Sequence, residues 1–565
     1  LSLWLICCAI SASFAQTFAQ TEEPFRERLR LQTDKELYLA GELVRLKAIA
    51  TDANGRPSDV SKVGYVELLN DSAPQVQIKL EMKHGVGEGA FSLPPSLPTG
   101  YYRLTAYTRY MRNEGEAVYY NRLLPVINPF IPLPAASVDS AVALSVATSF
   151  APSEAPAVAP SVSTDRAIYP PRTTGELRIE GLPEDLHTLS VSIAGMDSLT
   201  PALIHYDDYK RTLAQQPLLP GEQEYPEYEG PIITGTLIDL STGKTAAPTE
   251  KPTALLGFVG NRTQLFGGQI NEQGEVRFFT TQNANLREVS TTVLPTSSEQ
   301  YRVDIQSPFA RHTYAPLPAL PLHPAKNKAL QRRSVSLQVW QTYTAEADSA
   351  EQTDNGEPLF FPGKPDWRYL LDEYTRFGTM AEVVIEFIPG LRFRKTDNNN
   401  YTLSTLTEER TGFTPLPSLV LLDGIPLIDH GLIYHYNPLL IKEIEVYKGK
   451  YVFGGTVFDG LAHFKTYRND YPGLRLSGST QLFSYEGTPS PRLFPTPVYR
   501  TEEQRNSRLP DYRHTLLWKP QIEPHPGQAL IPFTTSDFTG DFRIIVEGLT
   551  RDGKRIHTTD FIRVE

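Results

Sequence analysis

The sequence is almost without cysteine: its two cysteines, Cys7 and Cys8, lie side by side near the start of the 565-residue chain. We expect this start to be removed as a signal peptide, which would leave a mature chain with no thiol. Such a chain has no disulfide framework, no thiol nucleophile and no Cys-ligated zinc site. The absence therefore excludes these kinds of stabilising and catalytic chemistry.

Catalytic and nucleotide-binding motifs are also missing. The sequence has no His-Glu-x-x-His, no Gly-x-Ser-x-Gly, no phosphate-cradling Gly-x-x-x-x-Gly-Lys-Ser/Thr and no calcium loop of the EF-hand type. The formal net charge of -11 is spread along the chain without a basic stripe, which argues against a nucleic-acid partner. We therefore expect a protein that is not an enzyme, with no catalytic residues and no cofactor.

The histidines are scattered singly, apart from one local cluster of metal-ligand residue types. His430 and His435 stand close to Asp423 and Asp429 in the sequence. The two histidines lie in an expected loop and lack the i, i+4 spacing that places two ligands on one helix face. We expect no metal site here, and surface or packing roles for the histidines.

Residues 1–19 have the pattern of a secretory signal peptide. An apolar core is followed by the small residues Ser13 and Ala15, which predicts cleavage before Gln16, and a second candidate site follows Ala19. The alternative is a transmembrane anchor, but the apolar run is too short to cross a bilayer. The basic start and the initiator Met are missing, so we expect the natural start to lie upstream. We expect an exported protein with no membrane-spanning segment in its mature chain.

Proline and glycine are abundant, with 47 and 38 residues, and they separate short runs of alternating apolar and polar residues. This pattern predicts a mainly β fold with many turns. The length suggests roughly three to five domains, since single hydrophobic cores stop growing well below this size. We expect several immunoglobulin-like β-sandwiches, one small α+β domain and no β-barrel.

Residues 29–130 carry the most specific resemblance to a known family. The segment TDKELYLAGE, which begins at Thr33, is followed far downstream by LPTGYYRLTAYTRYMRN. Together they resemble the macroglobulin-like domain that opens alpha-2-macroglobulins and related bacterial envelope proteins. The resemblance implies a β-sandwich, but no covalent protease trap, because such a trap needs a Cys-containing thioester. Residues 131–161 are rich in Pro, Ala and Ser, the composition of a linker.

Three further β segments are predicted. The opening of residues 162–205, STDRAIYPPRTTGELRI, echoes QTDKELYLAGELVRLKA and predicts a partial or second sandwich. Residues 230–310 resemble the small carboxypeptidase-regulatory type of β-sandwich, a family that is generally structural. Residues 510–565 alternate and turn at Asp552-Gly553, which predicts a closing sandwich segment. The alternative is that this last segment combines with the macroglobulin-like modules.

Residues 311–365 form an irregular connector in which we predict a helix at 328–344. Apolar residues spaced by three and four positions then predict two short helices over Trp367–Ile388. Thr379 is the expected N-cap of the second helix, with Glu382 three residues later.

The stretch around which the chain is organised lies within residues 366–468. Asp423-Gly424 predicts a tight hairpin turn between two short apolar strands, and Ile441–Tyr447 alternates as a half-buried strand before a glycine-punctuated loop. The order LVLLDGIPL, Pro-x-x-Ile-x-x-Ile-Glu-Val-x-Lys-Gly and Gly-Gly-x-x-x-x-Gly resembles the plug domain of TonB-dependent outer-membrane receptors. In that family the plug sits inside a large barrel, whereas the sequence after residue 468 is too short to supply one.

Six residues of this plug-like domain form the candidate surface for a partner or ligand, because aromatics beside glycine-rich loops suit recognition. They are Asp423, Tyr434, Tyr436, Tyr447, Tyr451 and Phe453. The alternative for the aromatics is packing beneath the glycine-rich loop, and for Asp423 it is the hairpin turn alone.

These features together predict a non-enzymatic cell-envelope protein in the periplasm or associated with the outer membrane. Its β-sandwich scaffold would present the plug-like domain to an outer-membrane protein or lipoprotein partner. This architecture resembles large envelope proteins of Bacteroidota-type bacteria. The alternative is a soluble periplasmic or surface binder of peptide or glycan, with the plug-like loops as its ligand site.

Overall fold

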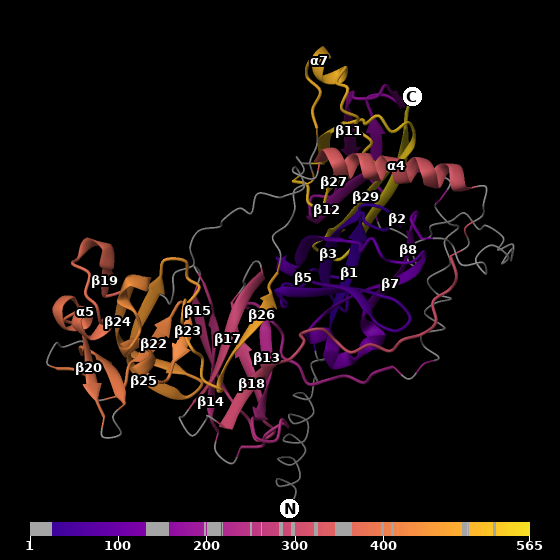
Figure 1. Cartoon of the computed structure of the whole chain (residues 1–565). Helices are drawn as coiled ribbons and strands as arrows, with labels where there is room; N and C mark the ends of the chain where they lie inside the picture. Colours follow the sequence, from indigo (N-terminus) through magenta and orange to yellow (C-terminus); the bar gives the residue numbers. More distant parts are fainter. Residues whose placement is uncertain are drawn as a thin grey trace, which may run out of the picture.

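The structure is a computed structural model in which three β-sandwiches and one mixed module can be followed (Figure 1). The predicted signal peptide at 1–19 and nearly all of the linker predicted at 131–161 lie outside the residues that it describes. The described residues are 25–131, 158–196, 199, 216, 218–248, 251–260, 263–281, 286–294, 300–320, 322, 326–344, 364–396, 400–407, 412–414, 416–488, 494, 497–523 and 527–565.

The first sandwich has eight strands in the order β1-β3-β6-β5-β4-β7-β8-β2. Strand β5 joins its two halves, because it pairs with β4 along its length and with β6 at its end. Its strands are β1 (Glu27–Thr33), β2 (Tyr38–Leu39), β3 (Leu43–Asp52), β4 (Val63–Leu69), β5 (Pro74–Lys83), β6 (Val86–Ser92), β7 (Gly100–Thr108) and β8 (Tyr120–Ile127). The 3₁₀ helices η1 (Tyr110–Glu114) and η2 (Glu116–Val118) connect β7 to β8.

The second sandwich is built from two segments that lie at distant places in the sequence. Its sheets have the orders β10-β30-β29-β12-β27 and β28-β11-β9. Its strands are β9 (Ser161–Thr164), β10 (Ile168–Tyr169), β11 (Thr174–Glu180), β12 (Leu186–Gly195), β27 (Thr515–Lys519), β28 (Gln528–Thr534), β29 (Gly540–Thr550) and β30 (Arg555–Val564). The segments predicted separately at 162–205 and 510–565 are thus halves of one sandwich. Neither half can bury its apolar face alone, so Leu189 and Val191 of β12 share one core with Ile544 and Val546 of β29.

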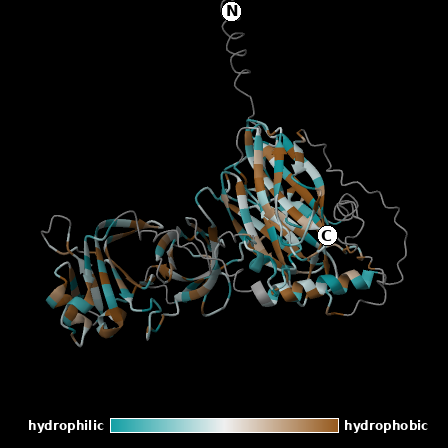
Figure 2. Ribbon diagram, turned by 90° about the horizontal axis from the view of Figure 1, so that it is seen from above, coloured by the Kyte–Doolittle hydropathy of each residue, from teal (hydrophilic) through white to brown (hydrophobic). Residues whose placement is uncertain are grey.

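The third sandwich has the sheets β16-β13-β18 and β15-β14-β17-β26. Its last strand lies far beyond the boundary predicted at residue 310, on the return from the mixed module. Its strands are β13 (Ile232–Asp239), β14 (Thr253–Phe258), β15 (Gln264–Gln269), β16 (Glu275–Phe279), β17 (Leu286–Leu294), β18 (Tyr301–Ile305) and β26 (Thr480–Glu486). Figure 2 shows hydrophobic and hydrophilic residues alternating along sandwich strands, as expected when one face of each sheet is buried.

The mixed module has one five-stranded sheet in the order β19-β24-β25-β22-β23 and a separate hairpin, β20-β21. Its elements are β19 (Trp367–Leu370), η5 (Leu371–Glu373), α5 (Met380–Phe387), β20 (Leu391–Lys395), β21 (Tyr401–Thr405), β22 (Leu419–Leu422), β23 (Ile425–Leu427), α6 (Gly431–Tyr434), η6 (Pro438–Leu440), β24 (Ile441–Phe453) and β25 (Thr456–Thr466). The prediction of a mainly β fold with several sandwiches and one small α+β domain is confirmed.

Two details of the mixed module differ from the prediction. Trp367–Leu370, predicted as helix, is a strand antiparallel to β24, because pairing at the sheet edge overrides the helical spacing of its apolar residues. The glycine-punctuated segment is not a loop, since β24 and β25 continue through it as one long hairpin with a register shift near Tyr447. The second helix is confirmed, and Thr379 and Glu382 form its capping box.

Helix α4 (Asn327–Thr344), which matches the helix predicted at 328–344, lies across the first and second sandwiches (Figure 1). Its Arg333 contacts both, with Nη2 3.3 Å from Glu42 Oε1 and Nη1 3.0 Å from His514 Nε2. Burial alone would raise the pKa of Glu42, but Arg333 and Lys35 outweigh it and lower that pKa to about 2. No helix in the described part of the chain is long and apolar enough to cross a membrane.

The connector that follows the third sandwich is fastened to the first sandwich by a buried histidine. His312 Nε2 lies 2.7 Å from Glu67 Oε1 and its Nδ1 lies 3.3 Å from Glu116 Oε1. Arg103 Nη2 donates to the same Glu116 oxygen at 3.2 Å, and Tyr107 donates to Glu67 at 2.6 Å. Burial opposes the charge on His312, but the hydrogen bonds to Glu116 and Glu67 outweigh it and raise its pKa. The connector is therefore held by a compact network of charged and polar groups.

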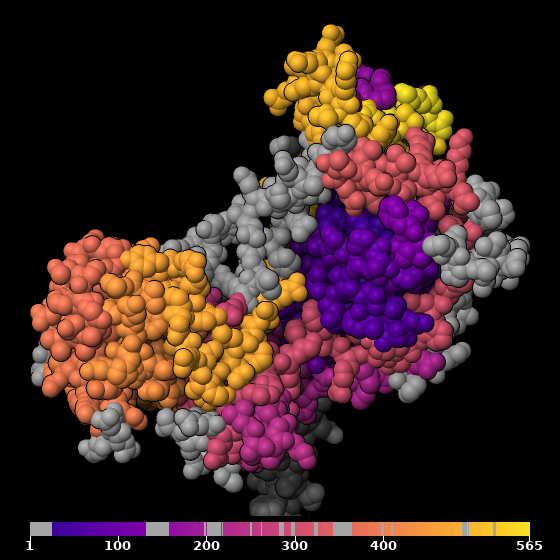
Figure 3. Space-filling view, in the orientation of Figure 1, coloured from indigo at the N-terminus to yellow at the C-terminus, as the bar shows by residue number. Residues whose placement is uncertain are grey.

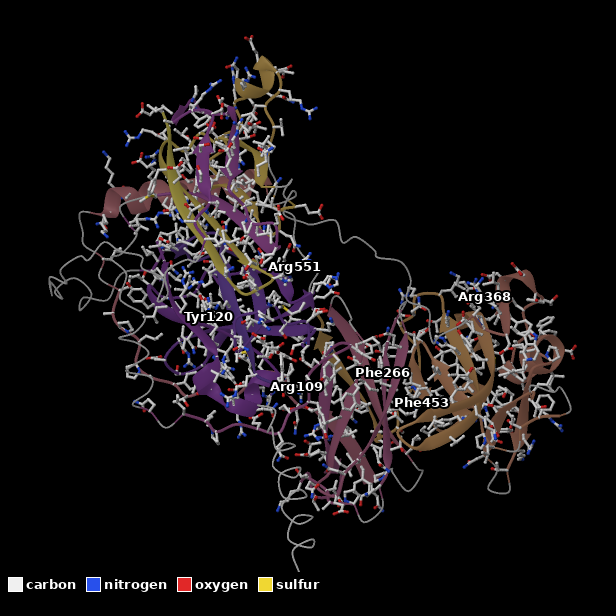
Figure 4. All side chains as sticks on the ribbon, turned by 180° about the vertical axis from the view of Figure 1, so that it is seen from behind. Arg109, Tyr120, Phe266, Arg368, Phe453 and Arg551 are labelled. Carbon is white, nitrogen blue, oxygen red and sulfur yellow. The ribbon has the colours of Figure 1, made fainter. Side chains whose placement is uncertain are left out.

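A second buried network joins the first sandwich to the third. Glu227, which is fully buried, accepts hydrogen bonds from Tyr65 Oη at 2.9 Å and from the backbone nitrogen of Ile232 at 2.8 Å. Arg109 Nη1 donates to the carbonyl oxygen of Ile232 at 2.6 Å, and its Nε donates to Glu224 at 2.7 Å. Figure 4 shows Arg109 where the first sandwich meets the third. These contacts set the start of β13 against the first sandwich.

Glu227 carries a testable consequence for stability. Burial raises its pKa from the ordinary value of 4.5 to about 7. Between these two pH values the folded protein keeps a proton that the unfolded chain loses, so stability falls as pH rises. Glu227→Gln has no proton to lose and should lack this fall, a difference of about 3 kcal/mol between acid and neutral pH. Urea unfolding at a series of pH values measures it.

The exposed Glu229→Gln, two positions away on the same connector, is the matched control and should keep the wild-type pH profile. The pH dependence is not due to Glu227 if Glu227→Gln loses as much stability with rising pH as the wild-type protein.

Candidate functional site

Three of the six predicted site residues lie in the contact between the mixed module and the third sandwich. Tyr447 and Phe453 are buried and Tyr451 is half-buried. Figure 4 shows Phe453 next to the labelled Phe266 of β15. The leucines of the third sandwich in the same apolar cluster are Leu255, Leu265 and Leu294. These aromatic side chains thus pack between the mixed module and the third sandwich, as the packing alternative predicts, and do not form a free surface.

Two turns of the mixed module approach the backbone of the third sandwich where only glycines fit. A Cβ atom on Gly257 of β14 would lie 2.2 Å from the carbonyl oxygen of Gly424. One on Gly267 of β15 would lie 2.5 Å from the nitrogen of Gly454. Thr253 Oγ1 also donates to the carbonyl oxygen of Gly454 at 2.7 Å. The β22–β23 and β24–β25 turns therefore dock the module onto the sandwich.

Asp423 and Tyr436 are also buried, and both hold the chain that leaves β25. Asp423 accepts hydrogen bonds from the backbone nitrogen of Thr466 at 2.7 Å, from its Oγ1 at 2.6 Å and from the nitrogen of Tyr471 at 2.8 Å. Tyr436 Oη donates to the carbonyl oxygen of Pro472 at 2.6 Å. Asp423 also has φ 49°, as a tight hairpin turn requires, so the predicted turn is confirmed. Its side chain adds a second structural role that the sequence does not signal.

In the histidine and aspartate cluster near the hairpin, His430 and Asp429 accept hydrogen bonds from the backbone. His430 Nδ1 accepts a hydrogen bond from the nitrogen of Leu403 at 2.8 Å, and burial lowers the pKa of His430 to about 4. Asp429 Oδ1 accepts from the nitrogen of Gly431 at 2.8 Å, while His435 is exposed. No group of three His, Cys, Asp or Glu side chains that could hold a metal occurs within the described ranges.

A partly exposed group of rings lies on the side of the mixed module formed by β20, β21 and α6. Tyr401 and Tyr434 stack with their ring centres 3.6 Å apart and their planes at 9°. Phe393 meets Tyr434 edge-on at 5.1 Å, and His435 meets Tyr434 edge-on at 5.0 Å. Three of these rings are half-buried and His435 is exposed. We call these four residues the aromatic face.

Cations border the aromatic face on β20. Arg392, Arg394 and Lys395 are all exposed. Lys395 lies opposite Tyr401 and on the same side of the hairpin as Phe393, whereas Arg392 and Arg394 alternate with Phe393 and lie on the other side. Arg392 also stacks over the ring of Phe413 at 5.6 Å. Half-exposed aromatic rings are themselves enriched at protein interfaces.

Of the predicted site residues, Tyr434 alone belongs to the aromatic face. Phe393 and Tyr401 were missed because they lie in segments that look unrelated in the sequence. Their strands place Phe393 opposite Leu403 and Lys395 opposite Tyr401, so both rings share one side of the hairpin. Period-two alternation shows which residues of each strand share a side, but only the pairing register shows that Phe393 and Tyr401 lie on the same side of the hairpin.

Comparison with known proteins finds no matching family model and no matching curated protein. Among solved structures, the chain is similar to Salmonella alpha-2-macroglobulin reacted with methylamine, with 10% identity, a TM-score of 0.25 and coverage of 95% of this chain and 39% of that one. The native conformation of Escherichia coli alpha-2-macroglobulin gives 10% identity, a TM-score of 0.23 and coverage of 96% and 40%. Dimeric latent PorU from Porphyromonas gingivalis gives 11% identity, a TM-score of 0.17 and coverage of 50% of this chain and 33% of that one. The chain spans about two fifths of the length of the two macroglobulins.

Gly257→Ala tests whether the two turns fix the mixed module to the third sandwich. The added methyl group would press on the carbonyl oxygen of Gly424, and overpacking of this kind costs about 1 to 3 kcal/mol. We expect faster hydrogen exchange at the β22–β23 turn and at Gly454, with the first sandwich unchanged.

Gly100→Ala is the matched control, because a Cβ atom at Gly100 would meet nothing within 4 Å. Equal exchange rates in Gly257→Ala and the wild-type protein would show that the close approach does not govern docking.

Proposed function

We propose that this chain is a non-enzymatic, exported cell-envelope protein that presents its plug-like mixed module to a protein of the outer membrane. Three β-sandwiches form the scaffold, and the aromatic face is the contact surface. The partner is an outer-membrane protein or an associated lipoprotein. The mature chain acts in the periplasm or associated with the outer membrane, as a transport or assembly accessory.

The observation that carries this proposal is that the module uses one set of aromatic residues to dock onto the third sandwich and keeps another set partly exposed. The turns and rings nearest the third sandwich are used to dock the module, with Phe453 buried there at 8% exposure. The aromatic face is built from other elements and remains accessible. A module fixed to a scaffold on one side holds its other rings in place for a partner, which lowers the entropy lost on binding.

The shape of the module also favours a protein partner over an enclosed small molecule. A hollow beside α5, lined by Leu371, Tyr374, Phe377 and Phe387 among others, has a cavity volume of only about 10 Å³, room for about one water molecule. Pockets for drug-sized ligands usually measure about 300 to 1,000 Å³. The aromatic face is an open arrangement of stacked and edge-on rings, which suits contact with another surface.

Removing the stacked rings is the direct test. Tyr401→Ala with Tyr434→Ala takes two half-exposed rings from the aromatic face, and truncating rings at the centre of an interface typically weakens binding by about tenfold or more. We expect the double variant, crosslinked in intact cells and purified from the solubilised envelope, to lose its outer-membrane partner at an unchanged thermal transition. The buried Tyr436 is unsuitable for this test, because its loss would break the contact with Pro472.

The matched control is Tyr225→Ala with Tyr228→Ala, which removes two exposed tyrosines from the connector before β13. This control should recover the partner as well as the wild-type protein does. Recovery of the wild-type protein as a free soluble monomer, or equal recovery of partner with both double variants, would refute the proposal.

The second candidate function is a soluble binder of peptide or glycan at the same face. The half-exposed rings of Tyr401 and Tyr434 favour it, since aromatic side chains supply both apolar contact area and a polar hydroxyl group to a ligand. This function requires that the purified protein alone gains thermal stability when a peptide or oligosaccharide is added, and that Tyr401→Ala with Tyr434→Ala abolishes the gain.

A further inference from the structure

A loop protrudes from the second sandwich at the end away from the mixed module (Figures 1 and 3). Described residues 497–511 form it, and its tip is the short helix α7 (Glu502–Arg505). We call these residues the α7 loop. Connecting segments of this kind are usually mobile unless other groups hold them.

The α7 loop is held by the guanidinium group of Arg172, which lies in the turn between β10 and β11. Arg172 Nη1 donates to the carbonyl oxygens of Arg505 at 3.1 Å and Ser507 at 2.8 Å, and its Nη2 donates to that of Leu509 at 2.6 Å. Its Nε and Nη2 also donate to the two oxygens of Asp537 at 2.8 and 2.6 Å. One side chain, only 8% exposed, thus binds three backbone carbonyl groups at alternate positions of the loop.

The backbone of Arg172 indicates that this side chain is required at its position. Its φ is 53°, in the left-handed region, where a residue other than glycine costs about 1 to 2 kcal/mol. Glycine would satisfy that backbone more easily, but it would leave the carbonyl oxygens of the loop without their donor. The hydrogen bonds of Arg172 to the loop and to Asp537, which we call the clamp, therefore offset the cost of its backbone conformation.

Two further hydrogen bonds order the base of the α7 loop, and a capping box orders its tip. Tyr499 Oη donates to Asp511 Oδ2 at 2.8 Å, and the backbone nitrogen of Asp511 donates to Asp537 Oδ2 at 2.8 Å. At the tip, Thr501 and Gln504 form a capping box. A loop ordered in this way is preformed, so a partner would not have to supply the entropy of ordering it.

The preformed α7 loop displays charged and apolar side chains that the fold does not use. Arg500, Arg505 and Arg508 are exposed, and none forms an ion pair with another described residue. Leu509 is 62% exposed beside them. The exposed acidic pair at the tip is Glu502 and Glu503. Arginine is enriched at protein interfaces, and Leu509 adds an exposed apolar side chain beside these arginines.

We infer that the α7 loop is a preformed docking site for a second protein partner, one that presents carboxylates around an apolar contact. The arginines match carboxylates in geometry and charge, and Leu509 supplies the apolar contact. Glu502 and Glu503, placed among the arginines, would be repelled by a uniformly anionic surface such as a phospholipid membrane. The site lies on the second sandwich, whereas the aromatic face lies on the mixed module, so, together with the function proposed above, the scaffold bridges two partners.

Site-specific photo-crosslinking tests this docking site in the full chain. A photoreactive amino acid at position 509, activated in intact cells of the host, should give an adduct with one protein. The same amino acid at Ile168, which is 55% exposed on the same sandwich, should not give that adduct. Arg505→Glu with Arg508→Glu should reduce the yield at position 509 by about tenfold or more, because like charges would then face each other.

Arg166→Glu with Arg178→Glu, two exposed reversals on the same sandwich, is the charge-matched control and should leave the yield unchanged. Reversing an acidic residue of the captured protein near its crosslinked peptide should restore the yield with Arg505→Glu and Arg508→Glu. The inference is overturned if no protein adduct forms at position 509, if the adducts are lipid only, or if charge reversal leaves the yield unchanged.

Trypsin cleavage of the α7 loop tests the role of the clamp separately. Arg172→Leu keeps the exposed arginines but releases the loop, so trypsin should cleave after Arg505 and Arg508 several-fold faster and the adduct yield should fall. Asp537→Asn, which weakens the same clamp, should act in the same direction. An unchanged yield from a loop that trypsin cleaves rapidly would show that preordering plays no part. Tyr401→Ala with Tyr434→Ala should not alter this adduct, which separates the two partner surfaces.

Discussion

The architecture depends on one pairing between distant parts of the chain, that of β12 with β29. Ser190 of β12 donates to the carbonyl oxygen of Glu547, 357 positions later, inside a ladder that runs the length of both strands. The entropy of closing so large a loop grows only slowly with its length, about 0.6 kcal/mol for each doubling. The apolar core shared by the two halves can therefore sustain the closure. The second sandwich cannot fold until residues 515–564 are available, whereas the first sandwich needs only local partners.

Buried polar networks set how the units are placed on this frame. The His312 network fastens the connector to the first sandwich, and the Glu227 network sets the start of the third sandwich against it. Burying such groups is costly, and apolar packing would serve stability equally well. Their directional hydrogen bonds instead allow one relative orientation of the units. The orientation matters because the third sandwich carries the mixed module, and the orientation of its aromatic face follows from these junctions.

The sequence was sufficient for features that depend on neighbouring residues. The Asp423-Gly424 turn, the Thr379 cap, the helix of α4 and the β character of most segments follow from local spacing and turn chemistry. Features that depend on distant partners were not accessible. The return of β26 to the third sandwich and the strand at Trp367 require the pairing partner to be known. The union of 162–205 with 510–565 was open only as the alternative that the last segment combines with the macroglobulin-like modules. The same limit applies to the site: Tyr434 could be singled out, but its stacking partner Tyr401 comes from another strand.

The large insertion in the second sandwich begins and ends at one place. The backbone nitrogen of Gly195, at the end of β12, donates to the carbonyl oxygen of His514 at 2.7 Å, just before β27. To the host sandwich, everything between these two residues is the connection of an ordinary hairpin. The pairing of β12 with β27 therefore does not depend on the length of the inserted chain. What ties the insertion to its host is a small set of side-chain contacts, such as those of Arg172 with the α7 loop and of Arg333 with His514.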